Sequence, residues 1–288
     1  MKEFPIPVVS TGPGSQIEED TLEYMHMPQG MNTFTAPSLP EPEDIAARID
    51  AHRALRSALT ELEAVCADGT NRTIDLNHLT QEDRALINQV LGEGEVSAIV
   101  KAPATGMAEL QVQESVFAGV WRVIQSVGGV VVSDTLELGA VPDALVAVAQ
   151  QDLWETTPRW QGELPPNVQN APALLAELED QWSRWRAGMP AHVINLTLLP
   201  MSDEDIGFLD HHLGTGRVLI LSRGYGNCRI LNTRTPHCWR VVYYNSQDTV
   251  ILNTVEVTTI PEVALAAPED LADSCARLKE VLEWVEHA

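Results

Sequence analysis

The chain has 288 residues, 44% hydrophobic and 20% charged, a composition typical of globular proteins. Its 18 basic and 41 acidic residues give a formal net charge of −23, which argues against nucleic acid or an anionic membrane as a partner. Four scattered cysteines are too few for a disulfide framework. Because the N-terminus lacks an apolar signal core and no run approaches the roughly 20 apolar residues of a spanning helix, we expect a cytoplasmic protein without direct membrane insertion.

Residues 1–42 are expected to form an extended N-terminal arm rich in proline and methionine. Proline at this density prevents long helices and removes backbone donors. Met25, Met27 and Met31 stand out because thioethers suit adaptable apolar contact surfaces. The arm therefore has two open interpretations, packing on its own domain or gripping a partner.

Residues 43–154 are expected to form the first of two domains. Apolar spacing predicts an amphipathic helix over residues 42–67, with Cys66 buried at its end. The remaining predicted elements are a strand (73–76), a capped helix (81–91), four strands (95–101, 109–114, 117–125 and 130–138) and a closing helix (141–153).

Residues 155–190 are expected to connect the domains through a proline-stiffened linker and a helix over residues 173–186. We expect Trp182 and Trp185 on this helix to pack between the domains. Residues 191–288 then form the second domain. Its predicted elements are a strand (192–196), a helix (203–213), four strands (217–223, 228–232, 237–244 and 249–258) and a final helix (269–286).

The two domains look like copies of one another. Residues 80–94 match residues 202–216 in order: a capping hydroxyl, an acidic first turn, an apolar helix face and Gly-x-Gly. Further along, Trp121-Arg122 falls on Trp239-Arg240. A period of roughly 120 residues indicates duplicated domains rather than a solenoid. The predicted fold class is α+β, with two duplicated domains that each hold a mainly antiparallel sheet with flanking helices.

The duplication helps to distinguish residues that are needed for folding from residues that serve a function. Features that both copies share, such as the Trp-Arg pair and the capped helix, are explained by folding. One segment has no counterpart in the first copy, and we predict that it binds a partner through Arg223, Gly224, Tyr225, Gly226, Asn227 and Arg229. Two arginines around an aromatic residue on a glycine turn are typical of recognition loops, although a structural β-turn is the alternative.

Cys228 and Cys238 are the second candidate, for a redox or iron-sulfur contact. If their hairpin turns at Thr233, the two thiols lie opposite each other. Two inert, half-buried cysteines are the alternative, and two thiolates fall short of the four ligands of a cluster. No nucleophile motif, phosphate-binding loop or metal-ligand spacing is present, so the sequence predicts no enzyme, no resident cofactor and no metal site.

Several motifs together resemble a known family. They are Gly92-Glu93-Gly94-Glu95-Val96, Gly224-Tyr225-Gly226-Asn227-Cys228-Arg229, Asn245-Ser246-Gln247-Asp248, Ile260-Pro261-Glu262-Val263, Ala266-Ala267-Pro268-Glu269-Asp270-Leu271, and the arm around residues 24–40. In this order they are similar to the HupH/HyaF family of hydrogenase expression proteins. The resemblance spans nearly the whole chain, but it carries over no catalytic residues.

The resemblance implies an accessory role in making uptake nickel-iron hydrogenase. The expected partners are the iron-sulfur small-subunit precursor, before its twin-arginine export, and other hydrogenase accessory proteins. A dedicated assembly chaperone is the first hypothesis, because an acidic protein suits a precursor with a basic signal peptide. A redox or iron-sulfur delivery factor that uses Cys228 and Cys238 is the second.

Overall fold

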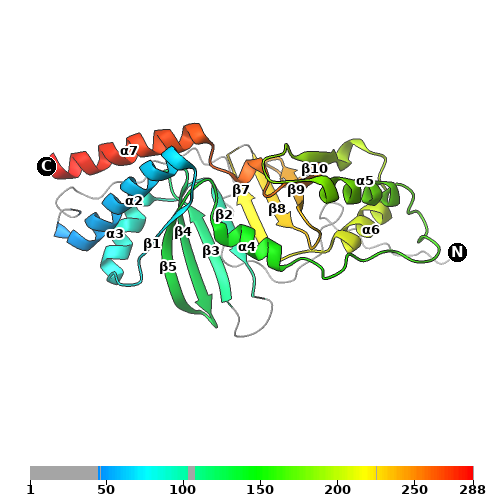
Figure 1. Cartoon of the computed structure of the whole chain (residues 1–288), viewed down its shortest axis with the longest axis horizontal. Helices are drawn as coiled ribbons and strands as arrows, with labels where there is room; N and C mark the ends of the chain where they lie inside the picture. The colour runs from blue at the N-terminus through cyan, green and yellow to red at the C-terminus, as the bar shows by residue number, and fades with distance from the viewer. Residues whose placement is uncertain (1–44, 46, 103–107, 225, 288) are drawn as a thin grey trace.

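The computed structural model describes residues 45, 47–102, 108–224 and 226–287, and contains the same order of elements twice (Figure 1). The first set is α2 (Ile49–Asp68), β1 (Arg72–Asp75), α3 (Gln81–Leu91), β2 (Val96–Val100), β3 (Ala108–Glu114), β4 (Val120–Val127), β5 (Val130–Leu138) and α4 (Asp143–Gln151). The second is α5 (Ala171–Arg184), β6 (His192–Asn195), η1 (Leu196–Leu198), α6 (Asp203–Leu213), β7 (Val218–Ser222), β8 (Asn227–Asn232), β9 (Cys238–Tyr244), β10 (Val250–Val257), η2 (Glu262–Ala264) and α7 (Pro268–His287). The predicted fold class is confirmed.

Within the described residues, the two half-sheets join into one antiparallel sheet of ten strands, in the order β1-β5-β4-β3-β2-β7-β8-β9-β10-β6. The join is the pairing of β2 with β7, where Ala98 lies opposite Ile220. The second half of this order repeats the first in reverse, as an approximate two-fold axis between β2 and β7 would produce. The sequence predicted two sheets but did not predict their union.

The repeated helices begin and end where the sequence indicates. The Thr80 hydroxyl accepts a hydrogen bond from the Asp83 amide, and Ser202 forms a reciprocal capping box with Asp205. Gly92 and Gly214 follow α3 and α6 with φ of 57° and 68°, a region that glycine enters without the Cβ clash. Both helices are therefore defined by local sequence signals at both ends.

The shared tryptophans hold equivalent positions in the two repeats. The indole nitrogens of Trp121 and Trp239, both buried, donate to the carbonyl oxygens of Gly139 at 2.9 Å and Thr259 at 3.0 Å. Each bond ties the strand that carries the tryptophan to the segment that follows the next strand. This supports the interpretation that the residues shared by the copies serve folding.

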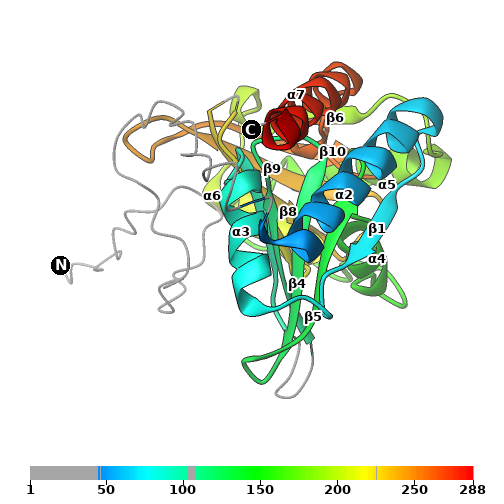
Figure 2. The same ribbon diagram turned by 90° about the vertical axis from the view of Figure 1, so that its left-hand side faces the viewer.

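Three clusters of buried apolar residues form the core. One lies under α2, α3 and α7 on the first half-sheet, and another lies under α5 and α6 on the second. The third covers the opposite face beneath α4 and η2. Figure 2 shows α4 across the sheet from α3 and α6. Neighbouring residues on one strand divide between the faces, as Val120 and Trp121 do.

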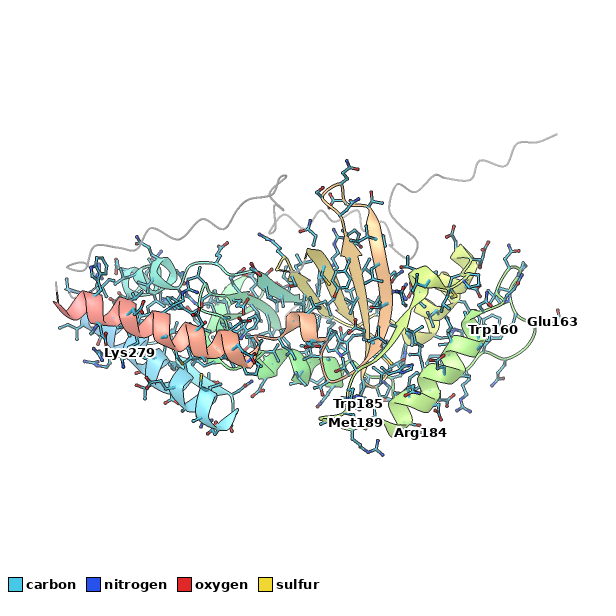
Figure 3. The ribbon with its side chains drawn as sticks, turned by 90° about the horizontal axis from the view of Figure 1, so that it is seen from above. Trp160, Glu163, Arg184, Trp185, Met189 and Lys279 are labelled. Carbon is cyan, nitrogen blue, oxygen red and sulfur yellow. The ribbon has the colours of Figure 1, made fainter. Side chains whose placement is uncertain are left out.

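The tryptophans of α5 lie elsewhere than the sequence predicted. Trp185 is buried in the α5–α6 cluster, and Trp182 packs against it. Every member of that cluster comes from the second repeat. Figure 3 places Trp185 well apart from Lys279 of α7 along the length of the molecule. The expectation that these side chains pack between the domains is therefore wrong, because the face of α5 that carries them packs on β10, β6 and α6.

Helix α4 of the first repeat crosses to the second. Leu145 and Val148 on this helix join the same buried cluster as Val218 and Ile220 of β7. Directly after α4, the Asp152 carboxylate accepts hydrogen bonds from the Arg217 amide at 2.6 Å and the Asn232 side chain at 3.0 Å. The guanidinium of Arg217 also donates to Asp152 at 2.6 Å. A residue of the first repeat thus completes the polar interior of the second.

Helix α7 crosses in the opposite sense, from the second repeat to the first. Leu278 and Leu282 belong to the cluster that contains Leu55 of α2 and Leu136 of β5. At the start of the helix, Leu271 packs so close to the backbone at Gly119 that a Cβ there would lie 1.9 Å from a leucine methyl. The two repeats therefore exchange their C-terminal segments.

Glu114 and Asn232 occupy equivalent positions in the two repeats, opposite Trp121 and Trp239 in the strand register. Asn232 is neutral and is hydrogen-bonded through both its side-chain oxygen and its side-chain nitrogen, whereas Glu114 is a buried carboxyl group near Gly119. Burial, with smaller contributions from the carboxylates of Glu95 and Asp270, raises the pKa of Glu114 to about 7, against the backbone hydrogen bonds that the carboxylate accepts. The first repeat thus carries a titratable group where the second has an amide.

We expect Asp152→Ala to lower the free energy of unfolding by about 3 kcal/mol, because it leaves buried donors of Arg217 and Asn232 without an acceptor. Urea unfolding followed by circular dichroism measures this change. The matched control is Asp50→Ala, which removes an exposed carboxylate bonded to Arg53 and should cost less than about 0.5 kcal/mol. Equal effects of the two substitutions would contradict the crossing contact.

We expect the stability of the protein to fall as pH rises from about 4.5 through about 7, since the unfolded chain releases the Glu114 proton in this range and the folded chain keeps it. The loss attributable to this residue is on the order of 3 kcal/mol. Urea unfolding of wild type and Glu114→Gln at about pH 5 and about pH 8 isolates it. A pH dependence that is identical in the two proteins would refute this assignment.

Candidate functional site

Among the residues that the structure describes, the middle of the sheet presents apolar side chains that belong to none of the three core clusters. Ile99 of β2, Leu219 of β7 and Leu231 of β8 are cross-strand neighbours and are half-buried. Val242 of β9 is also half-buried and lies opposite Arg229 of β8. None of the four apolar residues belongs to the three clusters. We call these four residues together with Arg229 the central sheet face.

This face lies between the two groups of covering helices. Cross-strand neighbours share one side of a sheet. One row of such neighbours starts under α3 on β5 and continues to β9. Its members are Leu136, Arg122, Gln113, Ser97, the buried Leu221, Arg229 and Val242. The first of these residues is in the α2–α3–α7 cluster, and α5 and α6 cover the sheet beyond the last. The central sheet face is thus a largely apolar surface of the sheet between α3 and α6.

The loop between β7 and β8 borders the central sheet face. The amide of Arg223 donates to the Glu95 carbonyl at 3.1 Å. At Gly224 a Cβ would lie 2.1 Å from a carboxylate oxygen of Glu95, and Gly226 has φ of +102°. The left-handed backbone gives Gly226 a structural reason to be glycine, whereas the contact at Gly224 is with the end of an exposed side chain that can move aside. The side chain of Arg223 remains exposed.

Arg229 and Asn227 are brought together with a residue that the sequence analysis did not single out. The Arg229 guanidinium lies over the Tyr244 ring at 5.0 Å from its centroid, and Asn227 lies opposite Tyr244 in the register. This contact orients the exposed Arg229 side chain on the central sheet face and does not neutralise its charge. The sequence could have predicted the contact between Arg229 and Tyr244 only if the register of β8 on β9 had been known.

Several predicted residues lie outside the described part of the chain. They are Tyr225 in the loop and Met25, Met27 and Met31 in the N-terminal arm. Their role in partner binding stays a prediction. Of the predicted loop, the structure describes Arg223, Gly224, Gly226, Asn227 and Arg229.

The expected juxtaposition of Cys228 and Cys238 is wrong. Cys228 lies opposite Tyr243 on β9, whereas Cys238 lies opposite Val257 on β10. The two side chains belong to different core clusters and so point to opposite faces of the sheet. The hairpin does not turn at Thr233, because a longer loop follows β8 and its Arg234 amide donates to the carbonyl at the end of α6.

Both thiols are also poor nucleophiles. Burial raises the pKa of Cys228 to about 12, with a further contribution from Glu256, and burial raises the pKa of Cys238 as well. The described residues contain no group of three or more histidine, cysteine or acidic side chains placed to hold a metal ion. The thiols that do approach each other are those of Cys66 and Cys275.

Among the helices in the described ranges, none combines the length and apolar character needed to cross a bilayer.

Comparison with known proteins assigns the whole chain to one group. The family model described as HupH hydrogenase expression protein, C-terminal conserved region, matches residues 49–164 and again residues 168–285. The hydrogenase expression/formation protein HoxQ of Cupriavidus necator is 54% identical over 288 residues, 99% of each chain. The hydrogenase expression/formation protein HupH of Rhodobacter capsulatus is 51% identical, with 98% of each chain covered. The hydrogenase-1 operon protein HyaF of Escherichia coli is 34% identical, with 96% of each chain covered.

We expect iodoacetamide to modify exposed Cys66 at least about tenfold faster than Cys228 or Cys238 in the folded protein at neutral pH, because the latter two are buried. Peptide mass mapping over a time course measures each rate. In urea the burial is lost, so the differences should shrink. Similar rates in the folded protein would show that the two strand cysteines are accessible and would reopen their redox role.

Proposed function

Because the chain belongs to the HupH family of hydrogenase expression proteins, we propose that it is a cytoplasmic, non-catalytic chaperone that binds the iron-sulfur small-subunit precursor of nickel-iron hydrogenase before export. The matched relatives are named hydrogenase expression/formation proteins, over nearly their full length. The observation that carries the choice of a binding role is the central sheet face, which leaves apolar side chains outside every core cluster.

The central sheet face is better suited to binding a protein segment than a small molecule. The apolar strip runs across three adjacent strands through Ile99, Leu219 and Leu231, so a bound segment can lie across the strands. Arg229 lies on this face, Arg223 is exposed directly after β7, and Glu109 of β3 is exposed on the same face. Apolar contact supplies the affinity and the charged groups at the rim fix the register of the bound segment.

The charge of the whole chain favours the same partner. With a net charge of −23 the protein attracts basic segments over long range at low salt. A precursor that carries a basic twin-arginine signal peptide is such a partner. In this proposal the acidic surface attracts the precursor electrostatically, and the central sheet face binds it. Other hydrogenase accessory proteins are further partners under this proposal.

The alternative, redox or iron-sulfur delivery through Cys228 and Cys238, loses its geometric basis. The two sulfurs point to opposite faces of the sheet, and burial raises the pKa of both thiols. A thiol pair for exchange chemistry needs adjacent sulfurs and a thiolate at working pH. The binding role requires neither.

We expect Arg229→Ala to weaken binding of the small-subunit precursor by about tenfold, and Arg223→Ala to weaken it by a smaller factor, since Arg229 is the one oriented on the central sheet face by Tyr244. Biolayer interferometry under anaerobic conditions, with the precursor immobilised, gives the dissociation constants.

The matched control is Arg184→Ala, at the end of α5, where an exposed arginine pairs with Asp180 (Figure 3). This variant should bind like wild type. If Arg229→Ala and Arg184→Ala have the same dissociation constant, the central sheet face is not the binding surface. If wild-type protein shows no binding of the precursor at all, the proposed chaperone role fails.

A further inference from the structure

Two cysteines that lie 209 positions apart in the sequence meet between α2 and α7. The Sγ atoms of Cys66 and Cys275 are 3.4 Å apart. Cys66 is exposed and Cys275 is half-buried. Both residues lie beside leucines of the same buried cluster, Leu62 on α2 and Leu278 on α7. Apolar packing therefore holds the thiols together, with no disulfide bond between them.

We propose that Cys66 and Cys275 form a dithiol site that peroxide oxidises to a disulfide, which fastens α7 to α2. The site differs from a lone reactive cysteine because a second thiol stands within contact distance on another element. Formation of the bond requires the sulfurs to move from 3.4 Å to the ~2.05 Å of a disulfide. We expect rotation of the exposed Cys66 side chain toward the half-buried Cys275 to provide a movement of this size.

The two thiols have different tasks in this reaction. Burial, together with the neighbouring thiol of Cys66, raises the pKa of Cys275 to about 12, so Cys275 is a poor first nucleophile. The exposed Cys66 thiolate attacks one oxygen of hydrogen peroxide. The O–O bond breaks, hydroxide leaves, and Cys66 becomes a sulfenic acid.

Cys275 completes the reaction. Its sulfur attacks the Cys66 sulfur, the S–O bond breaks, and the hydroxyl group leaves as water with the Cys275 proton. In total two thiols and one peroxide molecule give one disulfide and two water molecules. A neighbouring thiol at contact distance makes this second step faster than further oxidation of Cys66 by another peroxide molecule.

The disulfide should stabilise the fold because α7 is an exchanged segment that packs on the first repeat. Leu271, Leu278 and Leu282 of α7 complete the core of the first repeat. A covalent link from α7 to α2 prevents the helix from leaving this core and removes conformational freedom from the unfolded chain. The oxidised protein should therefore unfold at a temperature about 5 °C higher than the reduced protein.

The test uses the full chain, reduced and desalted, then treated with hydrogen peroxide at neutral pH. Expected are an intact mass lower by two hydrogen atoms, a proteolytic crosslink between the peptides of Cys66 and Cys275, and a melting temperature that rises by about 5 °C and falls again with dithiothreitol. In Cys275→Ser the second step is blocked, so dimedone should trap the Cys66 sulfenic acid.

Two results would overturn the proposal. One is Cys66 oxidised beyond the sulfenic acid, or linked between two copies of the chain, while Cys275 stays a thiol in wild type. The other is a complete Cys66–Cys275 crosslink without any change in melting temperature, which would remove the fastening role. Peptide mapping of wild type identifies the linked residues directly, so the outcome stands even if a variant folds poorly.

Discussion

The pairing of β2 with β7 is the contact on which the rest of the molecule depends. It joins two half-sheets edge to edge, with Ala98 opposite Ile220 near the middle. Without it each half-sheet would expose an apolar edge strand, which is a site for aggregation. With it, the outermost strands become β1 and β6, which are four residues long each and expose little unpaired backbone. The same pairing completes the central sheet face, since it places Ile99 of the first repeat beside the four residues that the second repeat contributes.

The exchanged segments make the repeats interdependent in a second way. Asp152 from the first repeat bonds to Arg217 and Asn232 of the second, and α7 from the second fills the core of the first. Each repeat thus lacks part of its own interior. The position of Glu114 shows that the copies have diverged, since one of them carries a titratable carboxyl group where the other has an amide.

Local signals in the sequence predicted the elements but not how they assemble. Capping residues such as Ser202 and the glycines after α3 and α6 define helix ends by short-range chemistry, so α+β duplication was predictable. The register of β8 on β9 depends on loop length, and a tight turn at Thr233 was assumed where a longer loop exists. That one assumption misplaced Cys238 and hid the Arg229–Tyr244 contact. The approach of Cys66 to Cys275 depends on packing between elements far apart in the chain, for which a single sequence carries no signal.

The exchange of α7 also sets the order in which the molecule can be built on the ribosome. Leu282 contributes to the same interior as Leu55 and Leu136, so that interior cannot close until more than half of the chain has followed Leu136 out of the ribosome. At typical elongation rates this leaves apolar surface of the N-terminal half uncovered for on the order of ten seconds. A protein proposed to shield an unfinished subunit would thus itself pass through a vulnerable nascent state.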